Sequence, residues 1–137
     1  MESKHTVSVL VDNETGVLAR VIGLISGRGY NIDSLSVAEV DTESHVSRIT
    51  FVTLGSEITI NKMIAQLQKL VPVKKAVNIT LDKHGIEREM ALVKVVATGE
   101  KRVESLRLSD AFRAKVIDTT HDSVSYTHLT LPTILLV

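Results

Sequence analysis

The chain of 137 residues has no cysteine and no tryptophan, and only 3% of its residues are aromatic. Without cysteine there can be no disulfide and no thiolate metal site. Sixteen basic and sixteen acidic residues give a formal net charge of zero, so the surplus of Lys and Arg that favours nucleic acid or an anionic membrane is missing. No apolar run has the length of a membrane span, and no signal-peptide pattern opens the chain. We therefore expect a cytoplasmic protein with no nucleic-acid and no membrane partner.

Hydrophobic residues make up 44% of the chain, enough for one domain with a core or for two small ones. Their periodicity predicts strands where apolar residues alternate and helices where they recur every three or four positions. The elements expected in the first 82 residues are a strand at 6–11, a helix at 16–28, strands at 32–40 and 46–54, a helix at 60–71 and a strand at 77–81. The order β-α-β-β-α-β predicts an α+β, ferredoxin-like domain, with a four-stranded antiparallel sheet backed by two helices.

A second, incomplete α+β domain is expected after a charged linker at residues 83–89 that contains Gly85. Its predicted elements are a strand at 90–97, a helix at 103–112 and a strand at 115–120, so that the partial domain covers residues 90–123. From residue 124 the helical period is lost, and residues 124–137 are expected to be a tail outside the domain, the product of a truncated reading frame. The tail ends in an apolar run.

The strongest candidate site is a pair of polar turns that flank the first helix. The segment Asp12-Asn-Glu-Thr-Gly16 leads into the helix, and Gly29-Tyr-Asn31-Ile32 leaves it. Backbone N–H groups at the start of a helix attract a carboxylate, and an asparagine amide offers both a donor and an acceptor. Together the two asparagines and the glycine-bearing turn suit a small zwitterion. No nucleophile–base pair lies in these turns, so the pattern indicates an amino-acid sensor with no catalytic residues.

These residues also carry a family resemblance. The segment from Val9 to Leu35, through Asp12-Asn-Glu-Thr-Gly16-Val-Leu-Ala-Arg20 and Arg28-Gly-Tyr-Asn-Ile32, closely resembles the regulatory (small) subunit of acetolactate synthase, whose N-terminal half is an ACT domain. The stretches 87–96 and 112–118 resemble the second domain of that family. The resemblance extends from about residue 5 to about residue 122.

The resemblance implies a regulatory subunit that is not itself an enzyme. It would activate the large catalytic subunit and make it sensitive to a branched-chain amino acid such as valine, in valine, leucine and isoleucine biosynthesis. Thiamine diphosphate, magnesium and FAD would belong to the large subunit, with none bound by this chain. The resemblance also implies a homodimer through the ACT domain, with the effector between the two chains. The effector-binding positions that it implies are Asn13, Gly16, Val17, Leu18, Asn31 and Ile32.

Other functions of the same fold fit the sequence less well. An RNA-recognition module needs aromatic residues on its central strands for base stacking, and the predicted third strand has only Phe51. An acyl-phosphate hydrolase would need an arginine in the first strand–helix loop, and residues 12–16 contain none. The five histidines are scattered without metal-ligand spacing, so no metal site is expected. A stand-alone ACT module that regulates some other enzyme stays open as the alternative.

Overall fold

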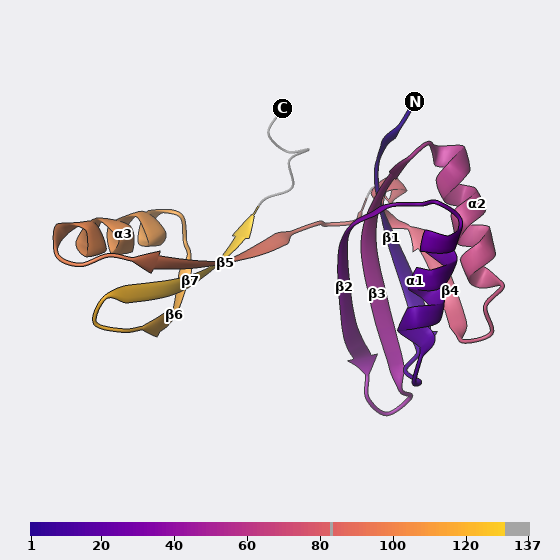
Figure 1. Cartoon of the computed structure of the whole chain (residues 1–137), viewed down its shortest axis with the longest axis horizontal. Coiled ribbons are helices and arrows are strands. Elements are labelled where there is room, and N and C mark those ends of the chain that lie inside the picture. Colours follow the sequence, from indigo (N-terminus) through magenta and orange to yellow (C-terminus); the bar gives the residue numbers. More distant parts are fainter. Residues whose placement is uncertain (83, 131–137) are drawn as a thin grey trace. The chain divides into compact units, whose positions relative to one another are not determined.

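The computed structural model describes residues 1–82 and 84–130 and divides the chain into two compact units, unit 1 at Met1–Gly85 and unit 2 from Ile86 onward (Figure 1). The elements of unit 1 are β1 (Ser3–Asp12), α1 (Val17–Gly27), β2 (Ile32–Asp41), β3 (Val46–Gly55), α2 (Glu57–Gln68) and β4 (Val73–Asn78). The strands form one antiparallel sheet in the order β2-β3-β1-β4. This arrangement confirms the predicted ferredoxin-like fold.

The core of unit 1 lies between the sheet and its two helices. Alternation along β1 turns Val7, Val9 and Val11 to one face of the sheet, where Val7 pairs with Phe51 and Val9 with Ile49 of β3. Both helices cover this face, with the buried residues Val17, Val21 and Ile25 of α1 and Ile60, Met63 and Leu67 of α2. Each such aliphatic side chain contributes about 1.5–3 kcal/mol when it is fully buried.

The end of unit 1 differs from the prediction. Residues 77–81 were predicted to form a strand, but β4 ends at Asn78 and a 3-10 turn follows at Ile79–Leu81. The Asn78 side chain causes the change, because its oxygen accepts a hydrogen bond from the N–H of Thr80 at 3.1 Å. Its amide nitrogen lies 3.0 Å from Nδ1 of the buried His5 on β1. The asparagine therefore stops the strand and anchors the turn to the sheet.

The second helix also has different ends from those predicted. It begins at Glu57, three residues before the first apolar position of the pattern, because the Ser56 hydroxyl caps it by accepting the N–H of Thr59 at 3.3 Å. It ends at Gln68, so Val71 lies beyond it and is exposed. Cap geometry therefore sets the helix ends more closely than the apolar repeat does.

Unit 2 contains β5 (Glu89–Val96), α3 (Glu100–Ala111), β6 (Lys115–Thr119) and β7 (Ser123–Thr130). Its sheet has the order β5-β7-β6 and is antiparallel. Within residues 1–82 and 84–130, none of the helices has the length and hydrophobicity of a membrane span.

Strand β7 corrects the expectation that the domain ends at residue 123. This strand is the centre of the sheet and pairs with β5 on one side and with β6 on the other. Val124 and Tyr126 are buried beneath α3, whereas the residues between and beside them carry hydroxyl groups. Two inward residues are too few to show a clear period, which explains why the sequence pattern missed the strand. Residues 131–137 of the expected tail lie outside the described residues.

Candidate functional site

The turn between β1 and α1 holds the first group of candidate residues. Gly16 stands at the N-cap of α1 with φ of +83°, a left-handed conformation that favours glycine. Because glycine has no side chain, no side chain caps the first amides of α1, and the first turn contains no acidic residue. The N-terminal end of α2, in contrast, is capped by Ser56. The start of α1 therefore presents uncapped donors and the positive end of the helix dipole.

Backbone contacts hold this turn against two neighbouring loops. The N–H of Asn13 donates to the carbonyl of His45, at the tip of the β2–β3 hairpin, at 2.7 Å. The N–H of Asp12 donates to the carbonyl of Pro72 at 2.9 Å, and the Asp12 carboxylate pairs with Lys74 at 3.0 Å. The Asn13 side chain is exposed and makes no hydrogen bond within the described part of the chain. Its backbone is fixed while its amide group is available to a ligand.

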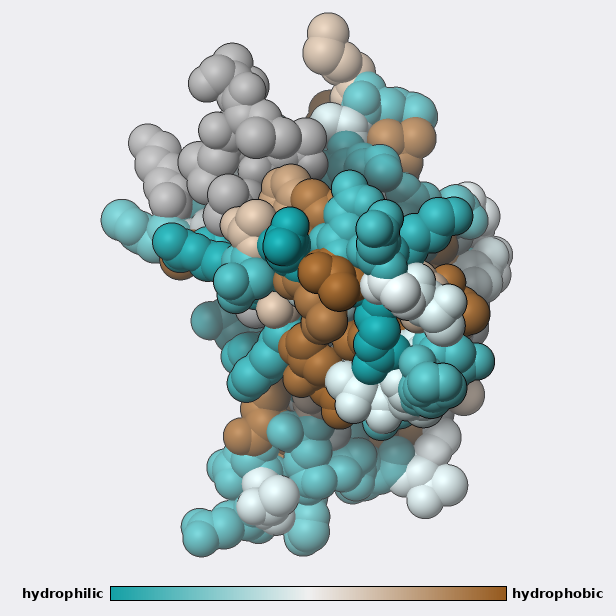
Figure 2. Space-filling model, turned by 90° about the vertical axis from the view of Figure 1, so that its left-hand side faces the viewer, coloured by the Kyte–Doolittle hydropathy of each residue, from teal (hydrophilic) through white to brown (hydrophobic). Residues whose placement is uncertain are grey.

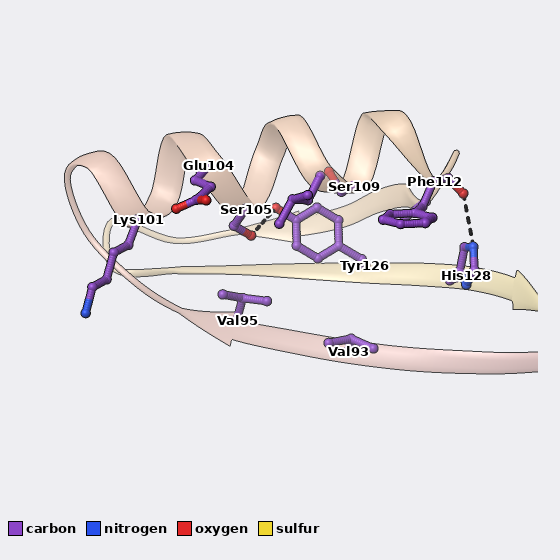
Figure 3. Close-up of a pocket in the computed structure, with 11 residues that line it drawn as sticks. Val93, Val95, Lys101, Glu104, Ser105, Ser109, Phe112, Tyr126 and His128 are labelled. Atoms are coloured by element: carbon purple, nitrogen blue, oxygen red, sulfur yellow. Dashed lines mark hydrogen bonds between the residues drawn. The ribbon is translucent and has the colours of Figure 1, made fainter.

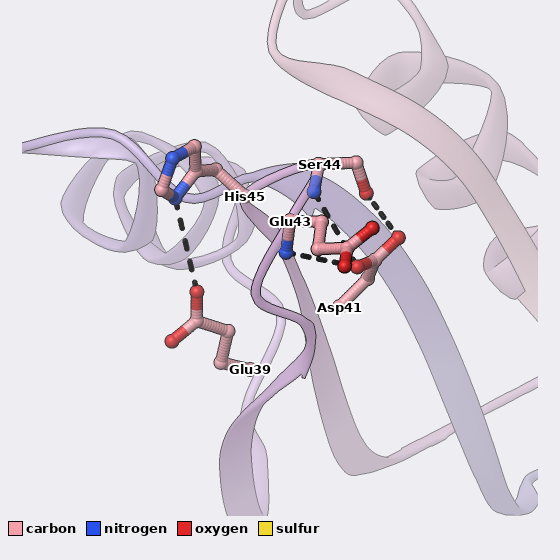
Figure 4. A network of polar contacts seen from close by, with 5 residues as sticks. All are labelled: Glu39, Asp41, Glu43, Ser44 and His45. Atoms are coloured by element: carbon pink, nitrogen blue, oxygen red, sulfur yellow. Dashed lines mark hydrogen bonds and ion pairs between the residues drawn. The ribbon is translucent and has the colours of Figure 1, made fainter.

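The hairpin tip that receives Asn13 is itself ordered by side-chain hydrogen bonds (Figure 4). The Asp41 carboxylate accepts the hydroxyl of Ser44 and the backbone N–H groups of Ser44 and Glu43. These hydrogen bonds, above all that from the Ser44 hydroxyl, lower the pKa of Asp41 from its ordinary value. His45 follows with a φ of +51°, the geometry that points its carbonyl group to Asn13.

Asn31 lies in the second polar turn, after α1. Gly29 has φ of +80° and ends the helix, and the N–H of Tyr30 reaches back to the carbonyl of Ile25 at 3.2 Å. The hydroxyl of the buried Thr53 donates to the Asn31 carbonyl at 2.6 Å. The Asn31 side chain is exposed and donates to Asp33 at 3.3 Å. Its backbone is thus fixed by β3, and its amide faces solvent.

The structure does not bring Asn13 and Asn31 together within one chain. Eleven residues of α1 separate the two turns, and at 1.5 Å per residue the helix is about 16 Å long. A small amino acid spans far less than that. A site that uses both asparagines therefore needs a second copy of the chain.

The other candidate positions divide between solvent and core. Leu18 is partly exposed on α1, beside the uncapped amides. The Val17 side chain is buried, and its N–H donates to the carbonyl of Glu14 at 3.3 Å, so Val17 supports the turn from within. Ile32 is partly buried and packs against the core cluster. Gly16 and Leu18 are thus the positions of the first turn that face solvent with Asn13.

Sequence reasoning missed the apolar surface of the edge strand β2. Leu35 and Val37 pair with the core residues Phe51 and Ile49 of β3 and point to the same face of the sheet, yet 41% and 44% of their surfaces stay exposed. The helices leave this margin of the sheet uncovered. An apolar edge strand is a ready template for pairing with another chain. The apolar residues 35 and 37 alternate with polar ones, as in a strand with one apolar face. The sequence does not show, however, that this strand lies at the edge of the sheet.

No group of three or more His, Asp or Glu residues is placed to hold a metal ion among the described residues. The candidate site therefore consists of uncapped backbone donors, two amide side chains and an apolar margin. Groups of these kinds are suited by their chemistry to a zwitterion with an aliphatic side chain.

Comparisons with known proteins identify the family of the chain. A family model described as an AHAS small subunit-like ACT domain matches residues 7–75, and one described as the small subunit of acetolactate synthase matches residues 88–128. The chain belongs to the acetolactate synthase small subunit family. The second match includes most of β7, in accordance with the place of this strand in unit 2.

Named relatives support the same membership. The chain is 43% identical over 120 residues to the probable acetolactate synthase small subunit of Archaeoglobus fulgidus. The matched segment covers 88% of this chain and 74% of that protein. It is 43% identical over 121 residues to the acetolactate synthase small subunit of Aquifex aeolicus, covering 88% of this chain and 62% of the relative. The crystal structure of the small subunit from Thermotoga maritima superposes with a TM-score of 0.84 at 34% identity, over 98% of this chain and 83% of that one.

Proposed function

We propose that unit 1 of this small subunit binds a branched-chain amino acid such as valine and uses it for feedback control of an acetolactate synthase. The observation that carries the proposal is the turn at Asn13 and Gly16, with an exposed amide side chain and uncapped helix amides at one point. The amides suit the carboxylate of the effector. Leu18, partly exposed in the same turn, supplies apolar surface for an aliphatic side chain.

The binding site is completed by a second copy of the chain. If two β2 strands pair antiparallel about a two-fold axis, the two sheets become continuous and the two α1 helices lie side by side in opposite directions. The N-terminal turn of one helix, with Asn13, then approaches the C-terminal turn of the other, with Asn31. Leu35 and Val37 would be covered in the same contact. The homodimer therefore explains both the separation of the asparagines and the exposed apolar edge.

The partner of this dimer is the large catalytic subunit, as the names of the relatives imply. In this proposal the chain is not catalytic: it activates the large subunit in the cytoplasm, and the large subunit holds thiamine diphosphate, magnesium and FAD. The described residues that form the site carry no group suited to proton abstraction or nucleophilic attack. Their chemistry is recognition of a charged backbone and an aliphatic side chain.

Reconstitution with a purified acetolactate synthase large subunit tests this function. Addition of the chain should raise the rate of acetolactate formation, and valine should then lower it. Leu18→Asp, which places a charge beside the apolar part of the effector, should weaken inhibition by valine. A chain that binds valine but neither copurifies with the large subunit nor changes its rate would instead favour a stand-alone ACT module for another enzyme.

A further inference from the structure

The two units hold the turn between their first strand and first helix by the same backbone contact. In unit 1 the N–H of Asn13 donates to the carbonyl of His45 at 2.7 Å. In unit 2 the N–H of Ala97 donates to the carbonyl of Asp122 at 2.9 Å. In both units the donor directly follows the first strand, β1 or β5, and the acceptor directly precedes the third, β3 or β7. The tip of each hairpin therefore places the turn that leads into the helix.

The residue that this contact places differs between the units. Asn13 carries an exposed amide group, whereas Ala97 has no hydrogen-bonding side chain. The surface beside α3 is also apolar, with a groove between α3 and its sheet lined chiefly by residues such as Val93, Val95 and Phe112 (Figure 3). Figure 2, which faces the side of Figure 1 that carries α3, shows a hydrophobic stripe flanked by hydrophilic side chains. Apolar surface does not replace the hydration of an ammonium or a carboxylate, so unit 2 shows the contact without the chemistry for a zwitterion.

The two hairpin tips are held in different ways. In unit 2 the helix holds the tip, because the guanidinium of Arg102 donates to the carbonyls on either side of Asp122 at 3.3 and 3.4 Å. Counted from the glycine before each helix, Arg102 corresponds to Ala19 of α1, whose methyl group cannot donate a hydrogen bond. In unit 1 the tip is held from within, because the Asp41 carboxylate accepts the hydroxyl of Ser44 and two backbone N–H groups (Figure 4).

These hydrogen bonds hold a backbone conformation that most side chains oppose. Ser44 directly precedes His45, whose φ of +51° lies in the left-handed region. The imidazole of His45 contributes little, because 77% of the side chain is exposed and its contact with Glu39 is 4.0 Å long. The Asp41 carboxylate is therefore the group that keeps the carbonyl of His45 directed at Asn13.

We propose that Asp41 and His45 are positioning residues of the effector site, which fix the place of Asn13 through the left-handed carbonyl of His45. The inference rests on the proposed function of unit 1 in effector binding, and the two residues act without touching the effector. Asn13 would meet the charged backbone that all amino acids share. The hairpin tip should therefore set the affinity for valine and leucine alike, and the preference between them should depend on apolar positions such as Leu18.

Calorimetric titration of the full chain with valine tests the role of Asp41. Asp41→Ala removes the acceptor of three hydrogen bonds and should weaken valine binding about fivefold or more. Asp41→Asn should keep the affinity within about twofold of that of the unchanged protein, since its amide oxygen accepts the same backbone N–H groups. Thr42→Ala is the control in the same tip, because the Thr42 side chain is exposed and makes no hydrogen bond within the part of unit 1 that the structure describes.

A pair of variants at His45 tests the backbone conformation. His45→Gly and His45→Val both remove the imidazole, but only valine opposes a positive φ. His45→Val should weaken valine binding about fivefold or more, and His45→Gly should leave it unchanged. The titrations are made at a temperature at which every variant is folded, so that a loss of stability alone does not alter the affinity. In each weakened variant, the affinity for leucine should fall by the same factor as that for valine.

Four results would overturn the positioning role alone. They are an unchanged valine affinity in Asp41→Ala or in His45→Val, an equal loss in His45→Val and His45→Gly, a failure of Asp41→Asn to bind as the unchanged protein does, and unequal losses for valine and leucine. In each case the unchanged protein still binds valine, and the proposed function stands. Absence of valine binding by the unchanged protein would instead overturn the proposed function, and the positioning role with it.

Discussion

Asn13 and Asn31 lie at opposite ends of α1, each with its backbone fixed by a neighbouring strand or hairpin and its amide side chain exposed. The helix between them has eleven residues. Two recognition groups held so far apart cannot close on one small effector in a single chain. In the proposed homodimer, the two-fold partner would place the end of its own α1 beside the start of the first, so that one effector would contact both asparagines.

The first prediction concerns Asn13. Asn13→Ala should weaken valine binding about tenfold or more, because a buried polar group of the effector that loses its partner costs about 1–3 kcal/mol. Isothermal titration calorimetry measures the change. Asn61→Ala, at an exposed asparagine on α2, is the matched control and should bind as the unchanged protein does. Equal affinities in the two variants would remove Asn13 from the site.

The second prediction concerns the edge strand. Val37→Lys should shift the protein towards monomer, since the substitution places a charge where the two β2 strands would pack. Sedimentation velocity at low concentration, with and without valine, reports the equilibrium, and valine should favour the dimer by mass action. Ile58→Lys alters an even more exposed apolar residue on α2 and should leave the equilibrium unchanged. A monomer that binds valine tightly is incompatible with a shared site.

The third prediction uses the repeated helix ends. Both α1 and α3 are followed by a left-handed residue, and the N–H after it reaches back five residues, from Tyr30 to Ile25 at 3.2 Å and from Ala114 to Ser109 at 2.8 Å. Gly29→Ala should lower the free energy of unfolding of unit 1 by about 1–2 kcal/mol, through backbone strain. A Cβ at that position meets nothing within 4 Å, so packing would not contribute.

Arg113→Gly is the complementary change in unit 2. Glycine adopts the left-handed conformation without strain but loses more entropy on folding, so we expect a gain of under about 1 kcal/mol. Native-state hydrogen exchange measures the stability of each unit separately, because each backbone amide exchanges when the structure around it opens. If Arg113→Gly instead destabilised unit 2, the arginine side chain would stabilise the unit by more than its left-handed backbone conformation destabilises it.

The sequence predicts the fold of unit 1 well because each strand and each helix buries one face. A buried face requires apolar residues at regular intervals, and these intervals are visible in the sequence. Val7, Val9 and Val11 show it in β1. The prediction failed where a single side chain decides the geometry, as Asn78 does by capping the turn that ends β4. It failed again at β7, whose inward residues Val124 and Tyr126 alternate with small hydroxyl residues that carry no hydrophobic signal.

For the candidate site, both the residue types and the separation of the two polar turns could be predicted from the sequence. The apolar period between the turns indicated a helix, and α1 places the turns at its opposite ends. The exposed apolar margin of β2 could not be predicted. Leu35 has the same alternating neighbours as a core residue, and its exposure depends on the strand order, which no local pattern encodes.

The fourth prediction is a pH dependence at the β2–β3 hairpin. Hydrogen bonds from Ser44, then from Glu43, lower the pKa of Asp41 below its ordinary value of 3.8. A carboxylate whose folded pKa is lowered stabilises the fold above its unfolded pKa and loses this contribution as the pH falls through the folded value. The hairpin tip should therefore loosen only below about pH 4. NMR titration of the Ser44 amide should follow this transition, and Asp41→Asn should abolish it; an unchanged titration in the variant would contradict the assignment.

The shared effector site is tested most directly by mixing two variants, Asn13→Ala and Asn31→Ala, each of which alone should bind valine poorly. In a mixed dimer, one site carries both substitutions and the other site carries neither. Random pairing should therefore restore about a quarter of the valine sites of the unchanged protein, with its full affinity. Calorimetry on the separate and the mixed variants gives the number of sites. A site shared between two chains predicts that tight binding recovers on mixing, and a mixture that binds no better than its components would contradict a shared site.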